Sequence, residues 1–145
     1  MLNPAMSKDS ELIRRSYEAW GSGDLDAYLQ TLHPDVEFHT SGLWPDFDSV
    51  YRGRRGLTEF WSRMHEPWEQ FRIDIEQIYE EGDCFATTVR IRAKGVDSGV
   101  EVDMRMGHTL RVRDGLIVEI VSRRTIEEAR QILSQRHPTA SSQRP

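Results

Sequence analysis

The chain has 145 residues, a length that suits one domain and is too short for two ordinary ones. A chain of this size buries about 70% of the surface that its unfolded form exposes, so apolar packing alone can hold the fold. The single cysteine, Cys84, excludes an internal disulfide and an all-cysteine metal site. The net charge of −5 argues against nucleic acid as a partner, because a phosphate backbone requires a clustered basic surface.

Membrane insertion and secretion are not expected from the sequence. No apolar segment approaches the roughly 18 residues that a membrane-spanning helix needs. The first residues, MLNPAMSKDSE, lack the apolar region of a signal peptide, so we expect a soluble cytoplasmic protein with no membrane partner. Residues 1–7 and 136–145 show no hydrophobic periodicity, which predicts two flexible tails around a single domain over residues 8–135.

Two helices are predicted in the first third of the chain. The first begins near Ser7 or Asp9, which can cap a helix, and ends at Gly21–Gly23, where glycine can adopt positive φ. The second begins after Asp24 and ends at His33–Pro34, because proline excludes the preceding residue from the α region. Their apolar residues lie three or four apart, as in amphipathic helices: Ile13, Tyr17 and Trp20, then Leu25, Tyr28, Leu29 and Leu32.

A strand, a loop and a third helix are predicted next. Val36–Thr40 alternates apolar and polar residues, as a half-buried strand does. The following segment, SGLWPDFDSVYRG, combines turn formers with large apolar residues, so we expect a loop that folds over the domain, with Trp44 as a lid across a pocket. The helix that follows ends at Pro67, and its apolar stripe is Leu57, Phe60, Trp61 and Met64.

Beyond Pro67 the hydrophobic period changes to two, which indicates strands. Turn residues divide this region into an antiparallel meander of four strands, Phe71–Tyr79, Cys84–Ala93, Val100–Val112 and Leu116–Ser122. Gly107 is the expected position of a bulge in the longest strand, and Thr125–Glu128 is a capping box that opens a final helix. Together the elements predict an α+β fold, with helices on one face of a curved sheet that encloses a cavity.

Four segments in this order resemble the NTF2-like superfamily, in particular its SnoaL-like and ketosteroid-isomerase-like members. They are GDLD (23–26), HPDVEFH (33–39), YRGRRGL (51–57) and HTLRVRDG (108–115), and the likeness covers residues 8–135. It implies a cone of helices against a strongly curved, mixed but mainly antiparallel sheet, and a homodimer formed through the outer face of the sheet. It implies a pocket but no particular substrate, because the superfamily includes isomerases, cyclases, dehydratases, epoxide hydrolases and non-catalytic proteins.

The resemblance makes His108, Tyr17 and Thr40 the candidate catalytic residues. Ketosteroid isomerases carry a carboxylate base at the position of Thr40, and a hydroxyl cannot take a proton at neutral pH, so that mechanism is disfavoured here. Their oxyanion donors fall on His108 and, in the first helix, on Ser16, which is next to Tyr17. In the alternation of its strand His108 falls on the apolar face, where it would act as acid, base or oxyanion donor. A histidine satisfied within the core is the equally weighted alternative.

The walls of the pocket are predicted from the aromatic residues and from the methionines of the long strand. Aromatic residues at helical spacing mostly belong to a core, yet four tryptophans in one small domain also suit a bulky apolar ligand. The predicted ligand-binding residues are Trp20, Tyr28, Phe38, Trp44, Trp61, Met104 and Met106.

Asp103 and Arg105 form a rival site, because limonene-epoxide-hydrolase relatives activate water with aspartate and arginine. Cross-strand ion pairs with Arg90 and Arg92 on a solvated face are the favoured interpretation. No histidines and carboxylates show metal-ligand spacing, so neither a metal nor another cofactor is expected. Cys84 has no basic neighbour in sequence and is interpreted as structural.

The leading hypothesis is an enzyme that acts by cofactor-independent proton transfer on a small hydrophobic carbonyl-like substrate, as an isomerase, cyclase or hydratase–dehydratase. Two alternatives remain open. A binding module without catalysis is favoured by the missing carboxylate at Thr40. A dimeric protein-interaction module would need an exposed apolar patch instead of a pocket.

Overall fold

Helices and strands account for most of residues 3–4, 7–44 and 46–136, the part of the chain that the structure, a computed structural model, describes. The helices are α1 (Lys8–Ser22), α2 (Leu25–Gln30), α3 (Gly53–His65) and α4 (Ile126–Arg136). The strands are β1 (Asn3–Pro4), β2 (Leu32–His39), β3 (Val50–Arg52), β4 (Trp68–Glu81), β5 (Cys84–Gly95), β6 (Glu101–Arg113) and β7 (Leu116–Arg123). The α+β class is thereby confirmed.

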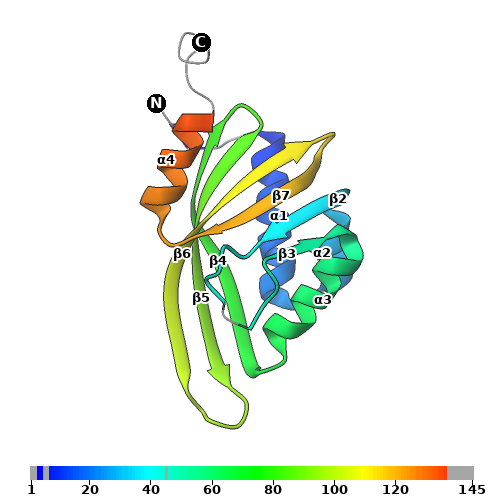
Figure 1. Cartoon of the computed structure of the whole chain (residues 1–145), viewed down its shortest axis with the longest axis vertical. Helices are drawn as coiled ribbons and strands as arrows, with labels where there is room; N and C mark the ends of the chain where they lie inside the picture. The colour runs from blue at the N-terminus through cyan, green and yellow to red at the C-terminus, as the bar shows by residue number, and fades with distance from the viewer. Residues whose placement is uncertain (1–2, 5–6, 45, 137–145) are drawn as a thin grey trace.

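The strands form one mixed sheet in the order β1-β4-β5-β6-β7-β2-β3. β2 pairs parallel with β7, whereas the other neighbours are antiparallel, as the predicted meander requires. The long strands β4, β5 and β6 curve along their length, and the sheet wraps around the inner layer of helices (Figure 1). The expected NTF2-like cone, with a strongly curved sheet, is confirmed.

The main core lies between the concave face of the sheet and α1, α2 and α3. α1 is capped as expected: the Ser7 side chain accepts a hydrogen bond from the Ser10 N–H, and Gly23 ends the helix at φ 79°. Asp24 caps α2 in the same way through the Ala27 N–H. The inward faces of these helices supply an aromatic cluster in which Trp20 contacts Tyr28, Phe60 and Trp61.

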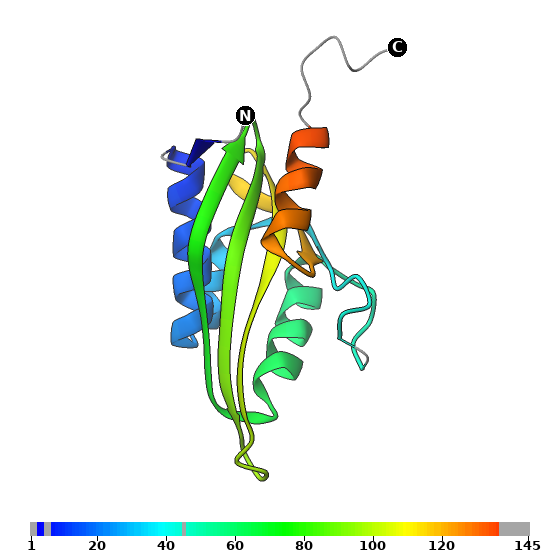
Figure 2. The ribbon, with the colours of Figure 1, turned by 90° about the vertical axis from the view of Figure 1, so that its left-hand side faces the viewer.

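α4 lies on the opposite face of the sheet from α1 (Figure 2), so the expectation that the helices share one face is wrong for this helix. Its residues Ala129 and Leu133 pack on Cys84 and Ala86, which point outward from β5. The close approach depends on Gly107, because a Cβ there would lie 2.5 Å from the Thr125 carbonyl oxygen. Gly107 is therefore a docking position and not a bulge, and the pairing of β5 with β6 continues unbroken through it.

Several boundaries differ from those expected. α2 ends at Gln30, and His33–Pro34 belongs to β2, where pairing with β7 is interrupted between Leu32 and Glu37 because proline has no N–H to donate. Val50–Arg52, expected in a loop, pairs with β2. Asn3–Pro4 pairs with β4, so part of the expected N-terminal tail belongs to the sheet. The C-terminal tail lies outside the described residues, apart from residue 136.

None of the described helices has the length and apolarity to cross a bilayer.

Candidate functional site

His108 lies in the middle of the sheet, on the concave face of β6. Its direct partners are Thr87 on β5 and Ser122 on β7. Residues directly opposite one another in an antiparallel pair project from the same face, so the three polar side chains form a row across the sheet. All three are buried, and His108 is 2% exposed. The expected inward orientation of His108 is therefore observed.

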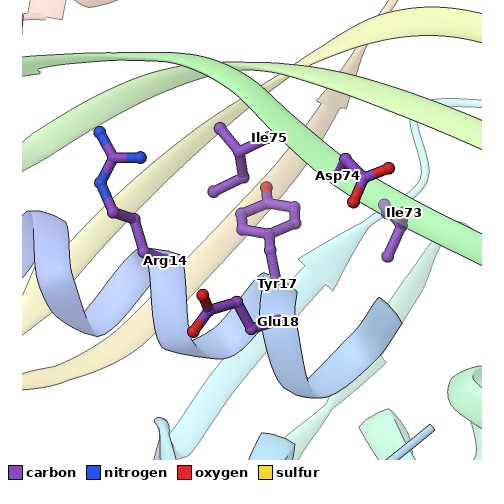
Figure 3. Close-up of a pocket in the computed structure, with 6 residues that line it drawn as sticks. All are labelled: Arg14, Tyr17, Glu18, Ile73, Asp74 and Ile75. Carbon is purple, nitrogen blue, oxygen red and sulfur yellow. The ribbon is translucent and has the colours of Figure 1, made fainter. Parts of the chain in front are cut away.

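Tyr17 reaches His108 from α1. Its hydroxyl lies 2.5 Å from His108 Nδ1 and 3.2 Å from Thr87 Oγ1. The Tyr17 ring points from α1 toward the sheet beside Ile75 (Figure 3) and contributes to a groove of about 210 Å³ between the helix and β4. Ser16, the alternative helix position, is instead bound by the Thr31 hydroxyl. The structure thus brings two of the three predicted catalytic residues into contact.

Burial determines the protonation of this pair. It lowers the pKa of His108 to about 3, because the imidazolium form loses its hydration and no carboxylate compensates. Burial also raises the pKa of Tyr17 above the ordinary value of 10.0, although its hydrogen bond with Thr87 opposes the shift. At neutral pH both groups are therefore uncharged.

Two proton arrangements are compatible with the hydrogen bonds that join Thr87, Tyr17 and His108. In the first, Thr87 donates to the Tyr17 oxygen, Tyr17 donates to His108 Nδ1, and the imidazole carries its proton on Nε2. In the second, His108 Nδ1 donates to Tyr17, Tyr17 donates to Thr87, and Nε2 is an acceptor. Among the described residues Nε2 has no hydrogen-bond partner in either arrangement.

A narrow cavity borders His108. Its volume is about 10 Å³, and a space of roughly 10–15 Å³ holds one water molecule. Its walls are mainly aromatic and aliphatic, with His108 and Ser122 as polar members: Trp20, Phe38, Trp44, Phe60, Met64, Phe71, Ile73, Ile91, Met106, His108 and Ser122. The apolar walls suit a small apolar group, and His108 and Ser122 are the residues there whose side chains can form hydrogen bonds with a polar atom of a ligand. That the cavity is a ligand pocket stays a prediction.

Four of the seven predicted wall residues line this cavity: Trp20, Phe38, Trp44 and Met106. Tyr28 and Trp61 do not; they are buried behind Trp20, and their ring centroids are 5.1 Å apart. Met104 is 37% exposed, whereas Met106, two residues further along the same face of β6, is buried. These three residues therefore belong to the core and the surface, and not to the wall of the cavity.

Thr40 also lies away from the cavity. Its side chain is fully buried, and its hydroxyl donates to the Asp48 carbonyl oxygen at 2.8 Å. Its backbone N–H donates to the Ser49 carbonyl oxygen, so Thr40 closes the loop between β2 and β3. The position that carries a base in ketosteroid isomerases thus holds a structural hydroxyl here.

The rival site on β6 forms ion pairs on the outer face; the predicted partner Arg90 is observed there, whereas Arg92 pairs with Asp74 of β4 instead. Arg90 donates to both carboxylate oxygens of Asp103, at 2.9 and 2.7 Å. Arg105 binds Glu76 in the same two-point manner. Neither pair lines the cavity. Within residues 3–4, 7–44 and 46–136, no three His, Cys, Asp or Glu side chains are grouped so that they could hold a metal ion.

Sequence reasoning missed two polar residues of the row, Thr87 and Ser122. The Ser122 hydroxyl is buried and has no hydrogen-bond partner among the described residues. Alternation along β7 gave no signal for it, because a one-residue register shift in the β6–β7 pairing decides which residue faces His108. Phe60 and Met64 are the wall residues that the helical stripe of α3 did predict as core.

Comparisons with known proteins agree with this architecture. The sequence profile of the SnoaL-like domain matches residues 13–120. Wild-type IdmH from Streptomyces antibioticus, a candidate polyketide cyclase, is 27% identical with a TM-score of 0.70, over 80% of this chain and 91% of that one. An NTF2-like protein of unknown function from Burkholderia pseudomallei is 23% identical with a TM-score of 0.74, over 89% and 99% of the two chains.

TerC, co-crystallised with polyporic acid, is 21% identical with a TM-score of 0.73, over 88% of this chain and 99% of that one. No protein with a curated description matches the chain. The two structures below 25% identity show the fold alone, whereas the profile covers most of the domain and includes both Tyr17 and His108. The chain belongs to the SnoaL-like family.

Proposed function

We propose that this protein binds a small hydrophobic carbonyl compound in the cavity beside His108 and promotes loss of a proton from the carbon next to the carbonyl. The observation that carries the proposal is the position of His108: Nδ1 is bound by the Tyr17 hydroxyl, Nε2 has no hydrogen-bond partner among the described residues, and the residue lines the cavity. The similarity to IdmH supports a cyclase-type reaction, which begins with such a carbon acid.

The protonation of His108 decides its role. A general base works best when its pKa lies near the working pH, and a pKa of about 3 makes the imidazole a poor base. A neutral imidazole can instead donate from Nε2 to a carbonyl oxygen and stabilise the negative charge that develops there. The proton arrangement in which Tyr17 donates to Nδ1 holds the proton on Nε2, so Tyr17 is a positioning residue.

The described residues that line the cavity provide apolar contacts for a ligand but no strong base. None of the residues that line the cavity in the described part of the chain is a carboxylate. The carbon proton therefore leaves to water, while His108 stabilises the resulting enolate. Binding of a ring-sized compound requires the cavity to expand, and Met64 and Met106 are unbranched side chains that can change conformation.

Deuterium exchange into the methyl group of acetophenone tests this role by NMR. The wild-type protein should accelerate exchange, and His108→Leu, which carries no hydrogen-bonding atom, should lower the acceleration by about 10²–10³-fold, as the loss of an oxyanion donor does. Tyr17→Phe should lower the acceleration less, because Nε2 remains and only the hydrogen bond that fixes the proton on Nε2 is lost. Exchange that is unchanged in His108→Leu would refute the role of His108.

A non-catalytic binding protein is the second candidate, favoured by the commitment of the Thr40 hydroxyl to Asp48 and by the absence of a carboxylate from the described cavity wall. The same experiment separates the two candidates. Binding of acetophenone without accelerated exchange would support the binding protein, whereas failure of acetophenone to bind would reject a carbonyl site. A homodimer through the outer face and a cytoplasmic location remain proposals, which light scattering and cell fractionation test.

A further inference from the structure

Two polar groups beside His108 lack hydrogen-bond partners in the described structure. They are the Trp20 indole Nε1–H and the Ser122 hydroxyl, and both atoms are buried. A buried polar group without a partner costs free energy relative to an apolar group of similar shape, so such groups are rare in folded proteins. Here both residues line the same cavity, and His108 lines it with them.

The three residues come from different parts of the fold. Trp20 is on α1, three residues after Tyr17, and its ring contacts Phe38 at a centroid distance of 6.1 Å. His108 contacts the same Phe38 ring at 5.7 Å. Ser122 is the direct partner of His108 across the β6–β7 pairing, so its side chain projects from the same face. Trp20 thus borders the cavity from the helix side, and His108 and Ser122 border it from the sheet side.

The chemistry of these groups selects the ligand. An indole N–H is a donor only, so it can be satisfied only by an acceptor. A hydroxyl can donate or accept, and the Nε2 of His108 donates when Tyr17 donates to Nδ1. Among the described residues that line the cavity, none is acidic and could accept a hydrogen bond from these groups.

We infer that Trp20 Nε1, Ser122 Oγ and His108 Nε2 form a donor site that recognises an oxygen acceptor on the ligand, and that Ser122 and Trp20 determine specificity for carbonyl or enolate oxygen over hydrocarbon. In the ligand-free protein the space is no larger than about one water molecule, so the cavity has to expand around the ligand oxygen and the group that carries it. This inference rests on the proposed function in one respect, the location of the ligand in the cavity.

A pair of probes that differ only at the acceptor tests the inference. Acetophenone carries a carbonyl oxygen, and α-methylstyrene carries a methylene group in its place. Titration of each compound into 15N-labelled protein yields the affinity and also the shift of the Trp20 indole N–H resonance. We expect acetophenone to bind at least about tenfold more tightly, and to move the Trp20 resonance downfield where α-methylstyrene does not.

Ser122→Ala is the matched variant. We expect this substitution to weaken the binding of acetophenone about five- to tenfold and to leave the affinity for α-methylstyrene unchanged. Its thermal midpoint should stay constant or rise, because the substitution removes a buried hydroxyl that no described residue satisfies. Ser62→Ala, on the exposed side of α3, is the control and should change neither affinity.

The outcomes separate this inference from the proposed function. Equal affinities for the two probes, with Ser122→Ala without effect on either, would overturn the donor site and leave an apolar ligand pocket in place. Binding of neither probe would reject the pocket and the donor site together. A loss of stability in Ser122→Ala would show that its hydroxyl serves the fold, and would also overturn the inference.

Discussion

The stability of this protein should depend on pH through His108 in a way that a single substitution removes. In the unfolded chain His108 takes a proton near pH 6.5, whereas in the folded protein burial lowers its pKa to about 3. Between these values the unfolded state binds a proton that the folded state does not bind. Stability contributed by the neutral histidine is therefore present above pH 6.5 and is lost as the pH falls toward 3.

The magnitude follows from the two pKa values. Each pH unit within this window changes the free energy of unfolding by about 1.4 kcal/mol, so acidification from pH 7 to pH 5 removes about 2 kcal/mol. A domain of ordinary stability has roughly 5–15 kcal/mol in total, so the loss is measurable by urea unfolding. Tryptophan fluorescence reports the transition, because Trp20 and Trp61 are buried in the core.

His108→Asn is the variant for comparison. An asparagine side chain can still accept a hydrogen bond from the Tyr17 hydroxyl, but it does not titrate. Between pH 7 and pH 5 the free energy of unfolding of the variant should therefore fall by about 2 kcal/mol less than that of the wild type. Carboxylates with lowered pKa, such as Glu37 and Asp103, are present in both proteins and cancel in the difference. If both proteins lose the same free energy, His108 titrates in the folded state as it does in water. An NMR titration of the His108 ring in the wild type would show the same thing without a substitution.

Three further substitutions test the structural roles of residues near the site. Thr40→Val should lower the free energy of unfolding by about 1 kcal/mol, because it removes the buried hydrogen bond to Asp48, and Thr58→Val on exposed α3 surface should have a smaller effect in the same urea titration. Gly107→Ala should destabilise by about 1–3 kcal/mol, since α4 has to move away from the new Cβ, and a thermal midpoint equal to the wild type would contradict the close approach. Arg105→Gln should leave the urea midpoint within error, because its ion pair is exposed to solvent.

The helices, the meander and the inward face of β6 were predictable because local rules govern them. Capping residues and glycine set the ends of α1, and the alternation of apolar residues placed His108 on the concave face. Tyr17 was predicted as a catalytic candidate only from the resemblance. Its contact with His108 could not be predicted, because it depends on how closely α1 packs on β6.

The position of α4 could not be predicted from its own pattern. A short amphipathic helix fits either face of a sheet, and the deciding residues lie elsewhere in the chain. Small side chains at Cys84 and Ala86 and the missing side chain at Gly107 make the outer face flat enough for Ala129 to approach. A glycine in a strand can indicate either a bulge or a close approach of another element, and the sequence contains nothing that distinguishes the two for Gly107.

Ser122 shows how a single irregularity changes the chemistry of the site. The hairpin pairs Val112 with Ile117, so a regular count of four residues along each strand would place Val121 opposite His108. The register shift between Arg111 and Val112 adds one residue on β7 and places Ser122 there instead. Without this shift His108 would face a valine, and the sheet side of the cavity would offer one polar group. With the shift, the protein holds a buried hydroxyl next to His108, and within the described structure neither this hydroxyl nor His108 Nε2 has a hydrogen-bond partner. The fold itself gains nothing from this hydroxyl, and under the inferred donor site the ligand oxygen is the partner that it lacks.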